Sequence, residues 1–377
     1  MESIYLDHAA SAPLRPEAFQ AMVPYLKDAV GNPNAAHAQG RKQRSALEEA
    51  RERIAACVGA RPEEIFFTSG GTESDAWAVH MGLWQARRRA GCLAASPIEH
   101  HAVLRPLENA ARQGALVRYL SVSPDGAADP DRAAGALTGA AFVSLMAANN
   151  ETGVIQPLEI IAVMAKERGA LFHTDAVQAA GCLRIDLESV PVDYMSASAH
   201  KFGGPVGVGF LYIRRGSPRC PLIRGGAQES NLRAGTQDVA GAVGMAAALE
   251  AASKEEDRLS ALRAKLEDAL RGFPGAVIHG RERERLPGII NVCLPGVPSA
   301  VLLPRLDLRG VCASAGAACT AGAAEVSHVL LSMGVSREDA LCSMRFSLGW
   351  TTTPEEIEKA GRIILEEAAA VRERAVR

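Results

Sequence analysis

The chain has 377 residues, of which 48% are hydrophobic and 22% are charged, and its formal net charge at pH 7 is −2. That length can bury a sizeable core and suits two or three structural units, and the composition excludes a disordered tail. The nearly neutral charge and an aromatic content of 5% argue against nucleic acid or an anionic membrane as a partner.

The sequence predicts neither a targeting segment nor a membrane span. The first residues lack a basic stretch followed by an apolar one, and no window of about 18 apolar residues occurs. The eight cysteines form no Cys-x-x-Cys pair. We therefore expect free thiols in a reducing compartment, the cytoplasm, and not a disulfide framework.

Helix-like and strand-like segments alternate up to about residue 213. The spacing of Leu47, Ala50, Ile54 and Cys57 predicts an amphipathic helix over residues 41–57, with these side chains on its apolar face. A strand at residues 65–68 and a helix from about Thr72 follow. Further strands are predicted at residues 116–122, 141–147, 170–173, 193–197 and 207–213. This alternation favours a mainly parallel sheet covered by helices on both faces.

From about residue 250 the pattern changes. Residues 254–270 are charged with a helical period, and a helix start signal, Thr-Pro-Glu-Glu, opens residues 354–377. Short strands are predicted at residues 288–294 and 343–348. We expect an α/β fold, with a large domain over residues 15–250 and a smaller α+β domain formed by residues 1–14 and 251–377.

Polar residues follow several predicted strands, where open parallel sheets bind their ligands. Residues 68–74, with glycines at 70 and 71, can cradle a phosphate on backbone N–H groups or form an ordinary glycine turn. Residues 149–153 have the composition of a turn. Asp175 taken alone is a helix cap, and only neighbouring functional groups would make it catalytic.

Three further positions carry reactive groups. Lys201 follows a small, apolar strand, where burial depresses the pKa of an amine and favours Schiff-base chemistry, although a lysine at the surface is the alternative. His100 and His101 diverge on a helix without ligands at zinc spacing, so we expect stacking or acid–base chemistry and no metal. Cys319 lies among small residues, Ala, Gly, Ser and Thr. Its thiol is therefore either accessible in a loop or packed in the core at a tight helix contact.

Together these residues resemble the cysteine desulfurase family of the NifS/IscS type, among the fold-type I, class-V-aminotransferase-like pyridoxal phosphate enzymes. The resemblance runs almost from end to end. It is carried by residues 5–10, Gly31-Asn32-Pro33 with His37, 68–73, Glu99-His100, 149–153, 175–178, 198–201, 224–226, Gly235-Thr236, Cys319 and 345–349.

The resemblance implies a fold-type I transferase, with a mainly parallel sheet of the seven-stranded type, that binds pyridoxal 5'-phosphate. Lys201 would carry the cofactor in a Schiff base and remove the Cα proton of the substrate. His100 would stack on the ring and shuttle protons, and Asp175 would pair with the pyridinium nitrogen. The other cofactor contacts would come from Gly71, Thr72, Asn150, Gln178, Ser198 and His200, and from Thr236, which would reach the phosphate from the neighbouring subunit of a homodimer.

The resemblance also implies the reaction. Arg345 and Asn150 would hold the α-carboxylate of L-cysteine. The Cys319 thiolate would attack the substrate sulfur, which leaves a persulfide on the enzyme and releases L-alanine. A sulfur-acceptor protein, such as a scaffold for iron–sulfur cluster assembly, would receive the sulfur.

Other functions remain open at this point. A selenocysteine lyase, or another class-V lyase or aminotransferase, would use the same cofactor residues. A sulfur-assembly partner protein without catalysis is an alternative of a different class. A Cys–His hydrolase would leave Lys201 and Asp175 unexplained.

Overall fold

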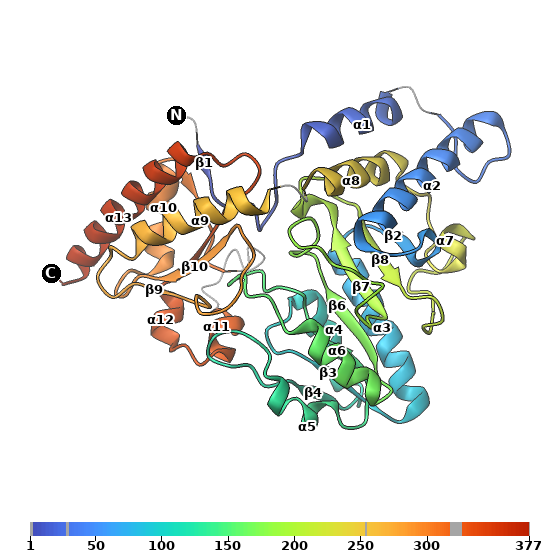
Figure 1. Cartoon of the computed structure of the whole chain (residues 1–377), viewed down its shortest axis with the longest axis horizontal. Helices are drawn as coiled ribbons and strands as arrows, with labels where there is room; N and C mark the ends of the chain where they lie inside the picture. The colour runs from blue at the N-terminus through green and yellow to red at the C-terminus, as the bar shows by residue number, and fades with distance from the viewer. Residues whose placement is uncertain (1–2, 28–29, 253–254, 317–325, 377) are drawn as a thin grey trace.

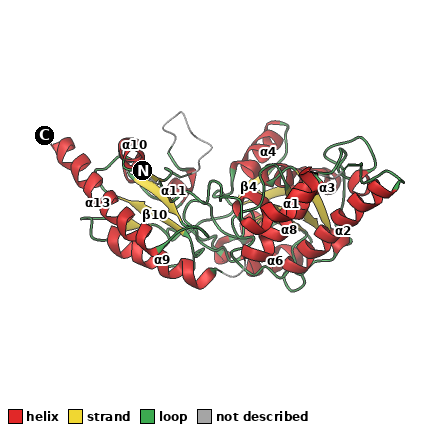
Figure 2. Cartoon of the chain, turned by 90° about the horizontal axis from the view of Figure 1, so that it is seen from above, coloured by secondary structure: helices red, strands yellow, loops and turns green. Residues whose placement is uncertain are grey.

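The computed structural model describes residues 3–27, 30–252, 255–316 and 326–376. The elements gather around two main sheets that lie side by side in an elongated molecule (Figures 1 and 2). We call the elements around the seven-stranded sheet the large unit and those around the three-stranded sheet the small unit. The domain boundaries given above stay a prediction. None of the helices in the described residues is long and apolar enough to cross a membrane.

The sheet of the large unit is mainly parallel, as predicted. Its strands, in spatial order, are β2 (Ile65–Thr68), β8 (Gly209–Ile213), β7 (Tyr194–Ser198), β6 (Leu171–Asp175), β5 (Ala140–Ser144), β3 (Cys92–Ala95) and β4 (Val117–Tyr119). Strand β8 runs antiparallel to β2 and β7, whereas β3 to β7 pair in parallel. The carboxyl ends of β2, β3, β5, β6 and β7 therefore meet at one edge, with β3 an addition to the predicted strands.

Helices cover both faces of this sheet because neighbouring residues of each strand are apolar and point to opposite sides. Phe142, Leu171 and Tyr194 pack in the cluster under α3 (Gly71–Arg89) and α4 (His101–Arg112). The other face packs against α2 (Ala38–Val58), α6 (Leu158–Glu167) and α8 (Val239–Ala252), with α1 (Pro16–Lys27) lying on α8. The short elements are η1 (Pro62–Glu64), η2 (Pro130–Arg132), α5 (Ala134–Leu137), η3 (Ala199–Lys201) and α7 (Gln228–Asn231).

The small unit combines a C-terminal sheet with the start of the chain. Strand β10 (Ile289–Cys293) pairs antiparallel with β9 (Val277–Ile278) and β12 (Ser343–Ser347). Its helices are α9 (Glu256–Leu270), α10 (Ser299–Leu308), α11 (His328–Ser332), α12 (Arg337–Leu341) and α13 (Pro354–Val376). Strand β1 (Ile4–Tyr5) pairs with β11 (Val311–Cys312), so the N-terminal segment starts in the small unit and then enters the large one (Figure 1). The predicted helices at 254–270 and 354–377 and both predicted strands are confirmed.

One packing prediction is wrong. Cys57 does not face the core but is exposed, and Val58 is buried instead. The apolar stripe of α2 follows Leu47, Ile54 and Val58, whereas Cys57 lies beside the surface ion pair of Arg53 and Glu250. Helical spacing gives the angle of a side chain but not how far the neighbouring element extends over it.

Candidate active site

A cavity of about 380 Å³ lies where the carboxyl ends of the central strands meet. Its walls contain ten of the predicted site residues: Gly71, Thr72, His100, Asn150, Asp175, Gln178, Ser198, His200, Lys201 and Arg345. Thr236 is exposed and does not line this cavity. Cys319 lies outside the described residues. The structure therefore brings together side chains from β6, β7, β12, α3 and α4, which are far apart in the sequence.

Lys201 is half-buried at the end of η3, directly after β7. Its amine donates hydrogen bonds to the carbonyl groups of Ala9 at 2.7 Å and Ala10 at 2.9 Å. Gln178 also donates to Ala9, at 2.8 Å. The N-terminal segment therefore lies directly against the amine of Lys201.

Two carboxyl groups lie together at the floor of the cavity. Asp175 ends β6, and burial followed by the nearby charge of Asp75 raises its pKa to about 8. Burial raises the pKa of Asp75, on α3, to about 7, although hydrogen bonds to Ser196 and Asp175 act to lower it. Sequence reasoning missed Asp75, although an aspartate in the second turn of a helix that opens after two glycines was a usable signal.

A neutral histidine lies beneath this pair. Burial lowers the pKa of His173 to about 4, so its ring is uncharged, and its Nε2 lies 3.0 Å from Ser196 Oγ and 3.5 Å from Asp75 Oδ1. The 3.5 Å contact is therefore not an ion pair. Asp75 Oδ1 is buried without a good hydrogen bond among the described residues. A positively charged ligand atom beside these two buried carboxyls would stabilise their charged forms.

His100 is held in one tautomer by its helix. It caps α4, and its Nδ1 accepts a hydrogen bond of 3.1 Å from the backbone N–H of Ala102. A backbone N–H only donates, so the ring proton is on Nε2. Burial, followed by the charge of Lys201, lowers the pKa of His100 to about 4. The ring therefore presents a neutral N–H group at physiological pH.

The N-terminus of α3 provides a cradle for an anion. Gly70, with φ of 146°, offers no side-chain cap, so the first N–H groups of this 19-residue helix lack an intrahelical partner. A Cβ on Gly71 would lie 2.7 Å from Val177 Cγ2, so only glycine lets the helix begin this close to the cavity wall. Hydroxyl-bearing Thr72 and Ser198 line the same region.

Arg345, on β12, brings a fixed positive charge from the small unit. Its Nη1 donates to the Asn150 carbonyl at 2.9 Å, and its Nη2 lies 2.9 Å from Asp7 Oδ1. Its Nε is buried and has no hydrogen-bond partner within the described part of the chain. A guanidinium that lines the cavity and is held in place by these two contacts is suited to a carboxylate.

Comparisons with known proteins show the family to which the chain is similar. Residues 4–360 match the family model described as Aminotransferase class-V. The chain is 44% identical to "Cysteine desulfurase IscS" of Dictyoglomus turgidum, over 94% of this chain and 91% of that protein. Among solved structures, a "NIFS-LIKE PROTEIN" is 36% identical with a TM-score of 0.92, covering 98% and 100% of the two chains. A structure titled "SspA in complex with cysteine" is 33% identical with a TM-score of 0.82, covering 92% and 98%.

Proposed function

We propose that this chain, which belongs to the class-V aminotransferase family and within it to the cysteine desulfurases, takes sulfur from L-cysteine with pyridoxal 5'-phosphate bound at Lys201, and keeps that sulfur on Cys319. The observation that carries the proposal is the cavity in which Lys201, Asp175, His100 and Arg345 come together. A partner protein without catalysis would have no need of this combination.

The residues present fit the cofactor. The protonated pyridine nitrogen would bring a positive charge to the buried Asp175–Asp75 pair. The phosphate would meet the N-terminus of α3, with Thr72, Ser198 and His200 beside it. Lys201 offers the amine for covalent attachment, and Gln178 a side-chain amide nearby. When bound, pyridoxal phosphate supplies an electron sink for the charge that develops at the substrate Cα.

The side chains around the cofactor site each have a distinct role. Arg345 binds the substrate carboxylate through its guanidinium group at the cavity wall, with Asn150 beside it, and this orients the Cα–H bond toward Lys201. The amine of Lys201 removes the Cα proton. His100, neutral with its proton on Nε2, would lie against the cofactor ring and move protons to and from the substrate.

Cys319 supplies the sulfur transfer. Its thiolate attacks the sulfur of the substrate, so that an S–S bond forms while the Cβ–Sγ bond breaks. The three-carbon fragment takes up protons and leaves as L-alanine, and the enzyme holds the sulfur as a persulfide. A thiol on a sulfur-acceptor protein, such as an iron–sulfur scaffold, then receives it. We place this chemistry in the cytoplasm, where free thiols persist.

We further propose a homodimer in which Thr236 serves the site of the other subunit. Thr236 is exposed on the segment between α7 and α8, and it does not line the cavity of its own chain. Arg233, three residues earlier, is anchored to Glu73 at the start of α3 by hydrogen bonds of 2.8 and 3.0 Å. This anchored segment presents the Thr236 hydroxyl outward, where a second copy can be reached.

The experiment that tests the proposal is an absorption spectrum of the purified protein before and after L-cysteine is added, with alanine and sulfide assayed together. We expect a yellow band that shifts on addition while alanine forms. Lys201→Ala should lose the band, and Cys319→Ala should keep the band but lose turnover. A colourless protein that pyridoxal phosphate cannot restore would contradict the proposal, and full turnover by Cys319→Ala would exclude the persulfide step.

A further inference from the structure

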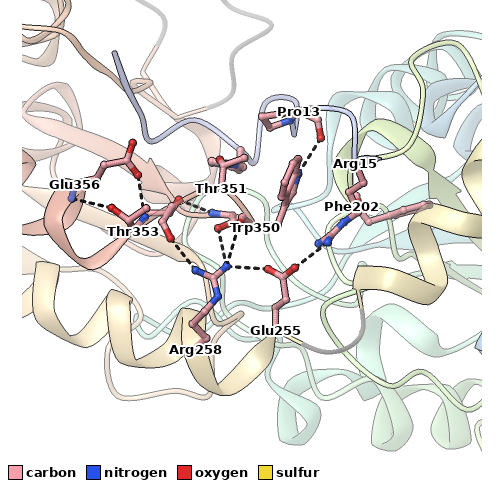
Figure 3. Close-up of polar contacts among 12 residues, drawn as sticks. Pro13, Arg15, Phe202, Glu255, Arg258, Trp350, Thr351, Thr353 and Glu356 are labelled. Atoms are coloured by element: carbon pink, nitrogen blue, oxygen red, sulfur yellow. Dashed lines mark hydrogen bonds and ion pairs between the residues drawn. The ribbon is translucent and has the colours of Figure 1, made fainter. Parts of the chain in front are cut away.

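A charged bridge of Arg15, Glu255 and Arg258 joins the two units (Figure 3). Glu255, which precedes α9, accepts from Arg15 Nη1 at 2.8 Å and from Arg258 Nη2 at 2.9 Å. The side chains of Glu255 and Arg15 are only 19% and 9% exposed. One carboxylate therefore holds two guanidinium groups, one from each unit.

Arg15 reaches the backbone next to Lys201, and Arg258 reaches the backbone of the turn that follows the strand of Arg345. Arg15 donates from Nε to the carbonyl of Phe202 at 3.0 Å, and Phe202 directly follows Lys201. Arg258 donates to the carbonyls of Gly349, Trp350 and Thr352 at 3.2, 3.2 and 2.7 Å. That turn follows β12, the strand that carries Arg345.

Trp350 also contacts the bridge, with its ring near Arg15 and its N–H bonded to the N-terminal segment. Its Nε1 donates to the carbonyl of Pro13 at 3.0 Å, and the guanidinium of Arg15 lies 5.5 Å from its ring centre. The turn after β12 is thus tied to the N-terminal segment as well as to α9. The same segment lies against the amine of Lys201 through Ala9 and Ala10.

We propose that Glu255 is a positioning residue that fixes the separation between Lys201 in the large unit and Arg345 in the small unit. The inference rests on the proposed function, because a three-carbon substrate must meet both residues at once. A displacement of about 1 Å is enough to lower catalysis strongly. The carboxylate also keeps two like charges together; without it, Arg15 and Arg258 repel each other and the turn at residues 349–353 moves away from Phe202.

The test compares Glu255→Gln with Glu367→Gln. Glu367 is a matched control, because it also accepts from two arginines, Arg305 at 2.7 Å and Arg309 at 2.6 Å, but all three lie in the small unit. The KM for L-cysteine and the dissociation constant of L-alanine are measured on the loaded enzyme. The affinity for pyridoxal phosphate and the hydrogen exchange of residues 349–353 are measured on the cofactor-free protein.

We expect Glu255→Gln to raise the KM and the L-alanine dissociation constant about five- to tenfold, to speed exchange at residues 349–353, and to leave cofactor affinity within about twofold. Glu367→Gln should change none of these. Arg258→Gln, a second variant in case the first does not fold, should behave like Glu255→Gln. Equal effects of both glutamate variants, or wild-type values in Glu255→Gln and Arg258→Gln, would overturn the positioning role alone. A wild-type chain that neither binds the cofactor nor forms alanine would instead overturn the proposed function, and this role with it.

Discussion

Arg345 and Asp7 form an ion pair inside the candidate site, with 2.9 Å between Nη2 and Oδ1. Asp7 also accepts from Ser314 Oγ at 2.7 Å, close to the segment that leads to Cys319. The pair holds the guanidinium plane in place while Nε remains without a partner among the described residues. A substrate carboxylate would therefore find a charge that is already oriented, which lowers the entropy lost on binding.

The first prediction concerns this guanidinium. Arg345→Lys keeps the charge but loses the planar, multiple donors, so we expect a loss of about 2 kcal/mol in substrate binding, or about 30-fold in KM. The affinity for pyridoxal phosphate should stay within about twofold, because Asp175, Lys201 and α3 all belong to the large unit. Steady-state kinetics and cofactor titration measure the two effects. A variant with unchanged KM would show that the carboxylate binds elsewhere.

The second prediction concerns His100. Burial lowers its pKa to about 4, so the catalytic neutral form is present from pH 8 down to about pH 5 and is lost as pH falls through about 4. In the cofactor-free protein we expect no titration of the His100 ring near pH 6.5, the usual pKa of histidine. His100→Gln should lower kcat by about 10²- to 10⁴-fold while keeping the yellow band. His101→Gln is the control, because His101 does not line the cavity; a His100 ring whose NMR signals titrate near pH 6.5 would contradict the neutral assignment.

The third prediction concerns the packing of the N-terminal segment against the turn after β12. A Cβ on Gly349 would lie 2.0 Å from Cδ2 of His8. The His8 ring cannot move aside easily, because its nitrogens lie 3.2 Å from the Ser347 carbonyl and 3.0 Å from Thr351 Oγ1. Gly349→Ala should lower the free energy of unfolding by about 3 kcal/mol.

Gly135→Ala is the control for this substitution. Apart from its chain neighbours and the backbone of its own helix, no atom of the described residues lies within 4 Å of the Cβ that it would add in α5. Its free energy of unfolding should stay level or rise by about 0.5 kcal/mol. Denaturant unfolding of both variants measures the difference, and equal stabilities would show that the His8 contact is relaxed in solution.

Much of the site could be predicted from the sequence, because Asp175 ends a strand, Lys201 and the glycines of residues 70–71 come shortly after one, and parallel strands end at one edge. Their order along the chain also carried the family resemblance. The contact of His8 with Gly349 spans 341 residues, and the bridge from Arg15 to Glu255 spans 240. No local pattern encodes such pairs. The role of Asp75 could not be predicted, because its partners come from strands that are distant in the sequence. The exposure of Cys57 could not be predicted either, because it depends on where the elements packed on α2 end.

The fourth prediction concerns the carboxyl pair. The pKa of Asp75 is raised by burial to about 7 from an ordinary 3.8, so the folded protein binds more protons than the unfolded chain between these values. Stability of the cofactor-free protein is therefore lost as pH rises through that window. Asp75→Asn removes this loss, and we expect its free energy of unfolding, relative to wild type, to be higher at pH 8 than at pH 5 by on the order of 1 kcal/mol. Thermal unfolding of both proteins without cofactor measures it, and a pH-independent difference would contradict the raised pKa.

The last prediction tests whether Thr236 acts across the dimer. Thr236→Ala alone should weaken pyridoxal phosphate binding about tenfold, because one hydroxyl bonded to a charged phosphate contributes about 1.5 kcal/mol. Mixed dimers of Lys201→Ala and Thr236→Ala chains separate the two arrangements. If Thr236 serves the neighbouring subunit, one site of the mixed dimer carries both substitutions while the other has a native Lys201 and receives a native Thr236.

At limiting cofactor, such a mixed dimer should bind pyridoxal phosphate at half of its sites with wild-type affinity. If Thr236 served its own chain, each site would carry one substitution and neither would bind normally. Chains with two different affinity tags allow the mixed dimer to be purified, and the absorbance of the bound cofactor counts the intact sites. Because both parental proteins are weak binders, recovery of native affinity in the mixture has no explanation within a single chain.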